Sequence, residues 1–187
     1  MSRLPNLLSW LRLFAAIPVV WLLLDGKYAA AGWLFLAAGL TDLADGWLAK
    51  RFNAHSEFGA RLDPLADKAL VGAVYLALGW IGLIPGWLVV MVLARDLSIL
   101  AGVGLLLAAR RPVKARPLAI SKINTGLQLA LVVGVLLAAA TGSAEHGLML
   151  AILMLLTAAA TVTTLVSWGS YALEWSRMMA AGAEPAR

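Results

Sequence analysis

TDLADGWLAKRFNAHSEFGARLDPLADK, residues 41–68, joins two apolar segments and carries four aspartates. Asp42 and Asp45 are three residues apart near its start, and Asp63 and Asp67 are four residues apart near its end. Residues at these spacings share one face of a helix, so each pair projects together from its own helix. The two apolar segments can be joined only at these acidic ends. The stretch therefore predicts a helical hairpin with two facing acidic pairs.

The composition indicates a membrane protein. Of the 187 residues, 62% are hydrophobic and 13% are charged, whereas a soluble domain is about half apolar. Apolar runs recur along the chain without a polar block that could form a separate soluble domain. We therefore expect one integral membrane domain over residues 1–175 and a polar tail over residues 176–187.

Six stretches approach the length of a membrane span, because a helix needs about 20 mostly apolar residues to cross a ~30 Å hydrocarbon core. They cover roughly residues 11–25, 29–50, 65–83, 86–109, 118–141 and 147–173. Gly and Pro mark the joints between them, as expected of chain reversals. Residues 2–12, SRLPNLLSWLR, interleave polar and apolar side chains and suit the membrane interface. The predicted fold class is an all-α membrane protein with six transmembrane helices, preceded by a short amphipathic interfacial helix.

Positive charges gather on one side of such a bundle. With the N-terminus in the cytoplasm, the opposite side receives only Lys27, and Arg95 falls inside the fourth span. The cytoplasmic side receives Arg3, Arg12, Lys50, Arg51, Arg61, Lys68, Arg110, Arg111, Lys114, Arg116, Lys122, Arg177 and Arg187. Because cytoplasmic loops carry an excess of Lys and Arg, both termini and the acidic hairpin are predicted on that side. The net charge of +5 also suits anionic lipids or phosphorylated substrates, although topology alone would explain it, and no nucleic-acid partner is expected.

The four carboxylates need an explanation, because a charge in the bilayer interior costs at least ~2.5 kcal/mol. The chain has no Cys and only two His, so a metal site must use oxygen ligands. Hard divalent cations, Mg²⁺ or Mn²⁺, fit a set of carboxylates. The alternative is ordinary helix capping or surface charge, and Asp63, before Pro64, could cap the third span. Four aspartates on paired helices favour a functional site.

The same stretch matches a known signature. It reads Asp42-x-x-Asp45-Gly46-x-x-Ala49-Lys50, then eight residues, Gly59, three residues, Asp63, three residues and Asp67. This resembles the motif D-x-x-D-G-x-x-A-R-x8-G-x-x-x-D-x-x-x-D of the CDP-alcohol phosphotransferases, with every spacing kept. The one departure is Lys50 in place of Arg, and Arg51 follows directly as a second candidate for its role.

The resemblance implies a six-helix membrane enzyme, commonly a homodimer, with its active site facing the cytoplasm. Two divalent ions, Mg²⁺ or Mn²⁺, would grip the pyrophosphate of a CDP-linked donor, and their ligands would be Asp42, Asp45, Asp63 and Asp67. The implied CDP-binding residues are Gly46, Ala49, Lys50, Arg51 and Gly59. Asp67 would also be the catalytic base that deprotonates the acceptor hydroxyl.

Further segments bear on the substrates. LPNLLSWLR (4–12) and LDPLADKAL (62–70) are similar to the phosphatidyltransferase branch, whose donor is CDP-diacylglycerol. AGLTDLADG (38–46), IPGWLVVMVLARDLSIL (84–100) and ISKINTGLQL (120–129) resemble the CMP-forming cardiolipin synthases, whose acceptor is phosphatidylglycerol. The related phosphatidylglycerophosphate synthases use glycerol 3-phosphate and more often have Glu after the fourth-span Arg. We favour phosphatidylglycerol as the acceptor and keep glycerol 3-phosphate as the alternative.

The cations available for an acceptor phosphate are Arg95, Lys114, Arg116 and Lys122. Arg offers a planar fork and Lys a point charge, and both suit phosphoryl oxygens. Arg95 needs a partner inside the fourth span, and the adjacent Asp96 is expected to point to another face of that helix. Lys122 could instead reach from its span end to the membrane interface.

Two other classes of function compete. A small cation transporter would use the aspartates as an ion site, but beyond them the spans carry only scattered Ser, Thr and Asn with Arg95, so no continuous polar route is expected. A catalytically inactive scaffold would not need all four aspartates. We expect an enzyme of the bacterial cytoplasmic or mitochondrial inner membrane, with its active site and both termini on the cytoplasmic or matrix side.

Overall fold

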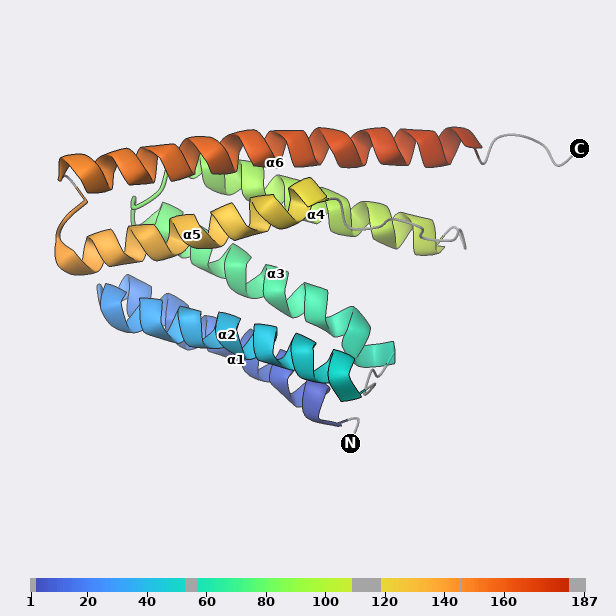
Figure 1. Cartoon of the computed structure of the whole chain (residues 1–187), viewed down its shortest axis with the longest axis horizontal. Coiled ribbons are helices and arrows are strands. Elements are labelled where there is room, and N and C mark those ends of the chain that lie inside the picture. The colour runs from blue at the N-terminus through green and yellow to red at the C-terminus, as the bar shows by residue number, and fades with distance from the viewer. Residues whose placement is uncertain (1–2, 53–56, 109–118, 145, 182–187) are drawn as a thin grey trace, which may run out of the picture.

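A computed structural model describes the backbone of residues 3–52, 57–108, 119–144 and 146–181. Side chains are described for residues 14–41, 68–105, 119–144, 146–176 and 178. The described chain forms six helices (Figure 1): α1 (Arg3–Leu24), α2 (Tyr28–Phe52), α3 (Glu57–Trp80), α4 (Gly86–Ala108), α5 (Ala119–Thr141) and α6 (Gly147–Ala181). The six predicted stretches are thus confirmed as helices.

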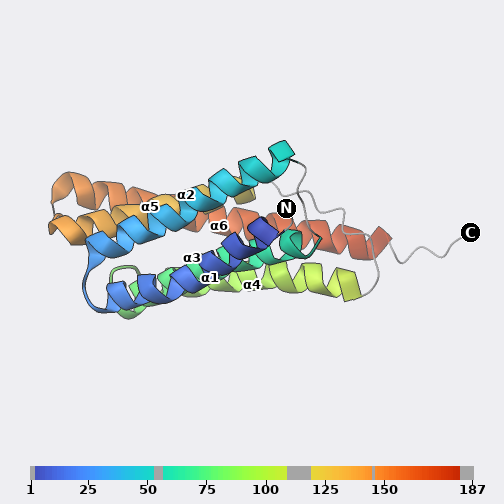
Figure 2. The same cartoon turned by 90° about the horizontal axis from the view of Figure 1, so that it is seen from below.

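Each helix runs opposite to the one before it. Short turns join α1 to α2, α3 to α4 and α5 to α6 at one end of the bundle, which we call the turn end (left in Figure 1). Gly26 and Gly82 in the first two turns have φ of 74° and 78°, a conformation that residues with a Cβ rarely adopt. The opposite end, at which α2 ends at Phe52 and α3 begins at Glu57, is called the charged end. The start of α1 and the end of α6 lie toward it (Figures 1 and 2).

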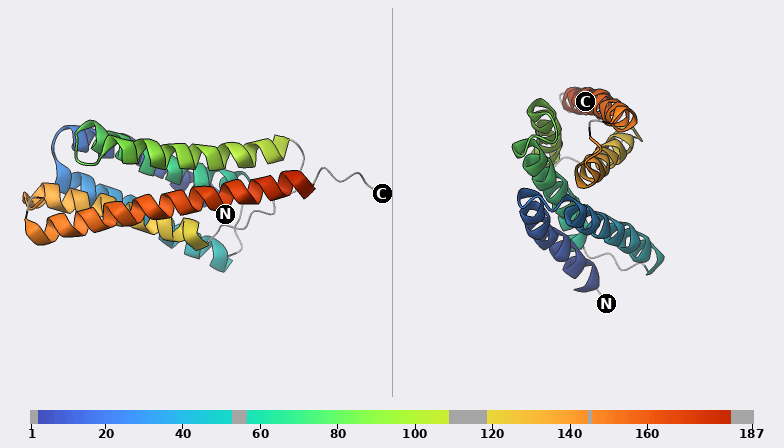
Figure 3. Two further views of the ribbon diagram at one scale, coloured as in Figure 1. Left: turned by 90° about the horizontal axis from the view of Figure 1, so that it is seen from above. Right: turned by 90° about the vertical axis from the view of Figure 1, so that its left-hand side faces the viewer.

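The helices close into a ring. In order around the ring, α1 contacts α2, α2 contacts α5, α5 contacts α6, α6 contacts α4, α4 contacts α3, and α3 contacts α1. An additional contact joins α3 to α5 across the ring, and Figure 3 shows the bundle end-on in its right-hand view. Helices far apart in the sequence therefore share one interior, which the polar residues described below occupy in part.

The interior changes character along the bundle. Toward the turn end it is apolar, with side chains less than 5% exposed at Val19, Leu23, Phe35, Val74, Leu78, Leu88, Leu131 and Leu136. Nearer the charged end, the buried side chains include the polar residues Arg95, Asp96, Asn124, Gln128, Thr164 and Ser167. Burying polar groups is costly unless they are hydrogen-bonded, and each of these six residues has at least one hydrogen-bond partner within the bundle.

Among the residues that the structure describes, three helices are long and apolar enough to cross a membrane, over Gly86–Leu105, Ala119–Thr141 and Gly147–Ser176. The apolar stretches of the other three are shorter within the described residues: Phe14–Leu24, Tyr28–Thr41 and Lys68–Trp80. The all-helical prediction is confirmed, and six crossings remain a prediction.

The start of the chain differs from the predicted arrangement. α1 runs continuously from Arg3 to Leu24, so no separate interfacial helix precedes the first span. The reason lies in the sequence, because no Gly or Pro separates the polar start at Arg12 from the apolar part that begins at Phe14. Pro5 lies in the first turn, where a helix tolerates proline.

Candidate functional site

The α2–α3 hairpin carries the four aspartates. Asp42 and Asp45 lie within about three turns of the end of α2, and Asp63 and Asp67 lie within about three turns of the start of α3. Both helix ends lie at the charged end (Figure 1). The stretch thus lies on two successive antiparallel helices, as predicted. The facing of the two acidic pairs stays a prediction, because the four carboxylates lie outside the described side chains.

The other residues of the signature follow the same two helices. Gly46, Ala49, Lys50 and Arg51 lie near the end of α2, and Gly59 lies in the first turn of α3. Their side chains also lie outside the described set. Lys114 and Arg116, predicted to contact the acceptor, lie outside the described residues altogether.

Asp63 does not cap α3. The helix begins at Glu57, six residues before Asp63, whereas a capping residue must flank the first turn. The apolar stretch from which the third span was predicted begins later than the helix, because α3 continues through polar residues beyond its apolar part. The capping alternative is therefore wrong for Asp63, and an ordinary surface charge stays the alternative to a functional role.

The donor set on this hairpin fits a hard divalent cation. Four carboxylates on neighbouring helix ends offer only oxygen, which Mg²⁺ and Mn²⁺ prefer. Among the side chains that the structure describes elsewhere, no group of three or more His, Asp or Glu could hold a metal ion. The four aspartates of this stretch supply the oxygen ligands that such an ion requires.

Arg95 is the centre of a buried network on α4, α5 and α6. The residue is 1% exposed. Its Nη1 donates to Oδ1 of Asp96 at 2.5 Å, and its Nη2 donates to the hydroxyls of Ser121 and Ser167 at 2.6 Å each. The ring of Tyr171 lies 5.9 Å from its Cζ. One guanidinium therefore connects three helices.

The prediction that Asp96 points away from Arg95 is wrong. Consecutive residues of a helix are about 100° apart, but the Arg95 side chain is long enough for its Nη1 to reach Oδ1 of Asp96. Asp96 also accepts a hydrogen bond at Oδ2 from Nζ of Lys68, at 2.7 Å. Lys68 follows Asp67 directly on α3, so this carboxylate connects α4 to the acidic hairpin.

A second buried group joins α5 to α6. Oδ1 of Asn124 accepts hydrogen bonds from the hydroxyls of Thr163 and Thr164 at 2.9 Å each. Nε2 of Gln128 donates to the hydroxyl of Thr164 at 3.4 Å. Tyr75 of α3 donates to the backbone carbonyl of Gln128 at 3.2 Å. Polar residues that are scattered along the sequence thus lie close together in the structure.

The sequence contained a signal for this gathering. Ser121, Asn124 and Gln128 are spaced three and four residues apart, as are Thr164, Ser167 and Tyr171. Each set therefore lies on one helix face. Toward the turn end, the buried residues of the described chain are apolar, so the polar group does not extend along the whole interior.

The cations predicted for the acceptor differ in exposure. Lys122, near the start of α5, is exposed. Arg95 is buried, and within the described chain its Nε is the only guanidinium nitrogen without a hydrogen-bond partner. A phosphate would find Lys122 accessible and Arg95 already engaged.

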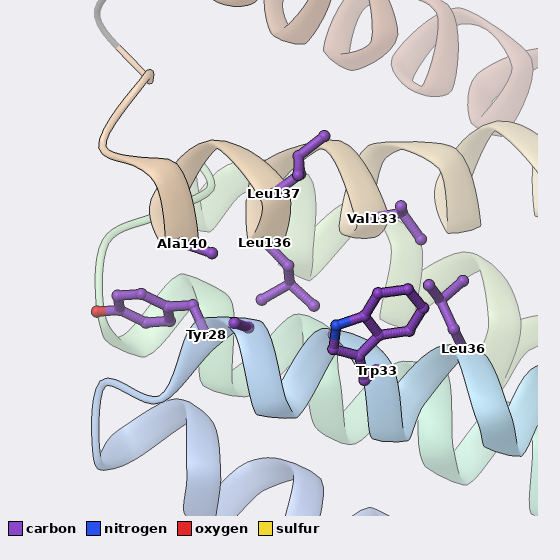
Figure 4. A pocket seen from close by; sticks show the side chains of 9 residues that line it. Tyr28, Trp33, Leu36, Val133, Leu136, Leu137 and Ala140 are labelled. Atoms are coloured by element: carbon purple, nitrogen blue, oxygen red, sulfur yellow. The ribbon is translucent and has the colours of Figure 1, made fainter.

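An apolar groove of about 200 Å³ lies between α2 and α5 (Figure 4). Trp33 and Leu36 face Val133 and Leu136 across it, and Trp33 is 75% exposed. These residues lie toward the turn end of α2, away from Asp42 and Asp45. The groove offers no carboxylate or cation and is not the site of the predicted chemistry.

Several known proteins are similar in sequence to this chain. The chain is 35% identical over 184 residues to the cardiolipin synthase (CMP-forming) of Rattus norvegicus, covering 90% of this chain and 61% of that protein. It is 33% identical over 184 residues to the chloroplastic CDP-diacylglycerol–glycerol-3-phosphate 3-phosphatidyltransferase 1 of Oryza sativa subsp. japonica, covering 89% and 56%. Over 105 residues it is 39% identical to the probable phosphatidylglycerophosphate synthase of Mycobacterium tuberculosis, covering 52% and 50%.

The chain thus spans between half and about three fifths of the length of these relatives. The family model described as CDP-alcohol phosphatidyltransferase matches residues 2–175, nearly the whole chain. That range includes all six helices except the last residues of α6. The chain belongs to the CDP-alcohol phosphatidyltransferase family.

Proposed function

We propose that the protein transfers a phosphatidyl group from CDP-diacylglycerol to phosphatidylglycerol and releases CMP, forming cardiolipin. The observation that carries this proposal is that the complete aspartate signature lies near the end of α2 and the start of α3, two successive antiparallel helices. The similarity to the rat cardiolipin synthase supports phosphatidylglycerol as the acceptor. The rice and mycobacterial relatives support the alternative, in which glycerol 3-phosphate is the acceptor.

In the proposed reaction, Asp67 accepts the proton of the acceptor hydroxyl. The acceptor oxygen forms a bond to the phosphorus of the phosphatidyl group, and the bond from that phosphorus to the CMP oxygen breaks. Asp42, Asp45, Asp63 and Asp67 would hold two divalent ions, which when bound would neutralise the pyrophosphate and the leaving CMP. Gly46, Ala49 and Gly59 leave space for cytidine, and Lys50 or Arg51 meets a nucleotide phosphate.

The acceptor phosphate is assigned to Lys122, Lys114 and Arg116. Lys122 is exposed near the start of α5, and its neighbour Ser121 binds Arg95. Arg95 itself contributes to the acceptor site mainly by holding α5 in place, because its Nη atoms are engaged by Asp96 and two serines.

We further propose that all six helices cross the membrane and that the protein is a homodimer. The alternating helix directions place the start of α1, the end of α6 and the α2–α3 joint toward one end, as an even number of crossings requires (Figure 1). The excess of Lys and Arg at that end supports a cytoplasmic or matrix location for it. The membrane would be a bacterial cytoplasmic or mitochondrial inner membrane.

The deciding experiment supplies purified protein in detergent with CDP-diacylglycerol, Mg²⁺ and either phosphatidylglycerol or glycerol 3-phosphate, and measures CMP. Release with phosphatidylglycerol is expected. Release with glycerol 3-phosphate but not with phosphatidylglycerol would show that glycerol 3-phosphate is the acceptor. No release with either acceptor, together with metal flux into protein-containing vesicles without nucleotide, would instead support a cation transporter.

A further inference from the structure

Lys68 and Asp96 form an ion pair beside the proposed base. Nζ of Lys68 lies 2.7 Å from Oδ2 of Asp96, and the two side chains are 29% and 10% exposed. Lys68 follows Asp67 on α3. The pair is partly removed from solvent, where charges interact more strongly than at a fully exposed surface.

The two cations that share Asp96 are held differently. Arg95 binds Oδ1 and is fixed by Ser121 and Ser167 as well. Lys68 binds Oδ2 and carries its charge on a flexible four-carbon stem. Of the two, Lys68 has the more flexible side chain, and it lies one residue from a proposed metal ligand.

An ammonium group close to the aspartates would compete with a divalent cation. Both are attracted to the same carboxylate oxygens, and an ammonium within a few ångströms would cancel one of the negative charges that attract the metal. A lysine at this position is thus a disadvantage for metal binding unless another carboxylate compensates its charge.

We propose that Asp96 is a positioning residue that draws the Lys68 ammonium toward α4 and so limits its competition with divalent cations at Asp42, Asp45, Asp63 and Asp67. The role rests on the metal site of the proposed function. Asp96 is not the only partner of Lys68, and a shared ammonium is sufficient, because each carboxylate that binds it lowers its attraction to the others.

The test measures binding of Mn²⁺ alone to the purified full chain in detergent, from the electron paramagnetic resonance signal of the free ion. Asp96→Asn is expected to weaken Mn²⁺ binding about tenfold, because the ammonium has one carboxylate fewer to hold it and is drawn more strongly to the aspartates. The double variant Lys68→Met with Asp96→Asn is expected to return to within about twofold of the wild type, since the competitor is gone.

The matched control is Asp25→Asn. Asp25 also pairs with a lysine, Lys27, at 2.9 Å, but it is exposed and lies at the turn end. Mn²⁺ binding is expected to be unchanged in this variant. If the double variant binds Mn²⁺ as weakly as Asp96→Asn alone, Asp96 does not act through Lys68, and the proposal is overturned.

Lys68→Met alone keeps the test decisive if Asp96→Asn does not fold, because Asp96 retains Arg95 in that variant. It is expected to bind Mn²⁺ at least as tightly as the wild type, and weaker binding would overturn the positioning role. Equal binding by the wild type and a folded Asp96→Asn would overturn that role alone. A wild type that binds no Mn²⁺ would overturn the metal site of the proposed function, and the positioning role with it.

Discussion

The indole of Trp175 occupies the space that a side chain would need at Gly102. A Cβ added at Gly102 would overlap Cζ2 and Cη2 of Trp175. Gly102 is on α4 and Trp175 is on α6, so these two helices meet at a position where only glycine leaves room. Small residues allow such close approach between membrane helices.

Gly102→Ala is therefore expected to lower the free energy of unfolding by about 1–3 kcal/mol, because the indole must move to avoid the new methyl group. Thermal unfolding in detergent measures the change. Gly104→Ala is the matched control on the same helix, since nothing lies within 4 Å of a Cβ added there. Equal losses in both variants would contradict the contact with Trp175.

Arg95→Met removes the group that joins α4, α5 and α6. Breaking a buried ion pair from one side costs about 3–5 kcal/mol, and the expected loss in unfolding free energy is of that size. Because Asp96 keeps Lys68 as a partner in this variant, the expected loss in unfolding free energy is at the lower limit of this range. The readout is the denaturation midpoint in detergent.

Arg95→Lys separates charge from shape in this network. It keeps one positive charge but loses the planar fork that reaches Ser121 and Ser167, so an intermediate stability is expected. If Arg95→Met unfolds at the same midpoint as the wild type, the network does not hold the three helices together.

The helices themselves could be predicted from the sequence because their ends carry local signals. Turns around Gly26 and Gly82 interrupt long apolar stretches, and the structure has glycines with positive φ there. The limits of α3 and the continuity of α1 were harder to predict, because both helices extend through polar residues at the charged end. The length of an apolar stretch indicates which residues can cross a membrane, but it does not indicate where the helix begins.

The candidate site was predictable where it depends on spacing within one helix. The signature places Asp42 near Asp45 and Asp63 near Asp67, and the observed helices preserve both spacings. The pairing of Lys68 with Asp96 was not predictable in this way. It depends on how α3 rotates against α4, which is set by tertiary packing and leaves no pattern in either segment alone.

Thr164→Val tests the polar group between α5 and α6. The substitution preserves shape but removes a hydroxyl that donates to Asn124 and accepts from Gln128. Leaving buried partners unsatisfied costs about 1–3 kcal/mol, which is the expected loss in unfolding free energy. Thr157→Val is the control, because the Thr157 hydroxyl donates to the carbonyl of Leu153 within its own helix. A similar loss in both variants would show that the interhelical bonds contribute nothing.

Asp67→Asn tests the proposed base. Turnover measured as CMP release is expected to fall by about 10²–10⁴, because asparagine cannot accept the proton of the acceptor hydroxyl. The thermal unfolding midpoint should remain near that of the wild type, and Asp25→Asn, at the exposed turn end, should keep full activity.

Raising the Mg²⁺ concentration distinguishes the two roles assigned to Asp67, metal ligand and base. A variant that has only lost a metal ligand recovers activity as Mg²⁺ approaches saturation, whereas a variant that has lost the base stays inactive at every concentration. Recovery with Mg²⁺ would restrict Asp67 to metal binding and transfer the role of base to another residue.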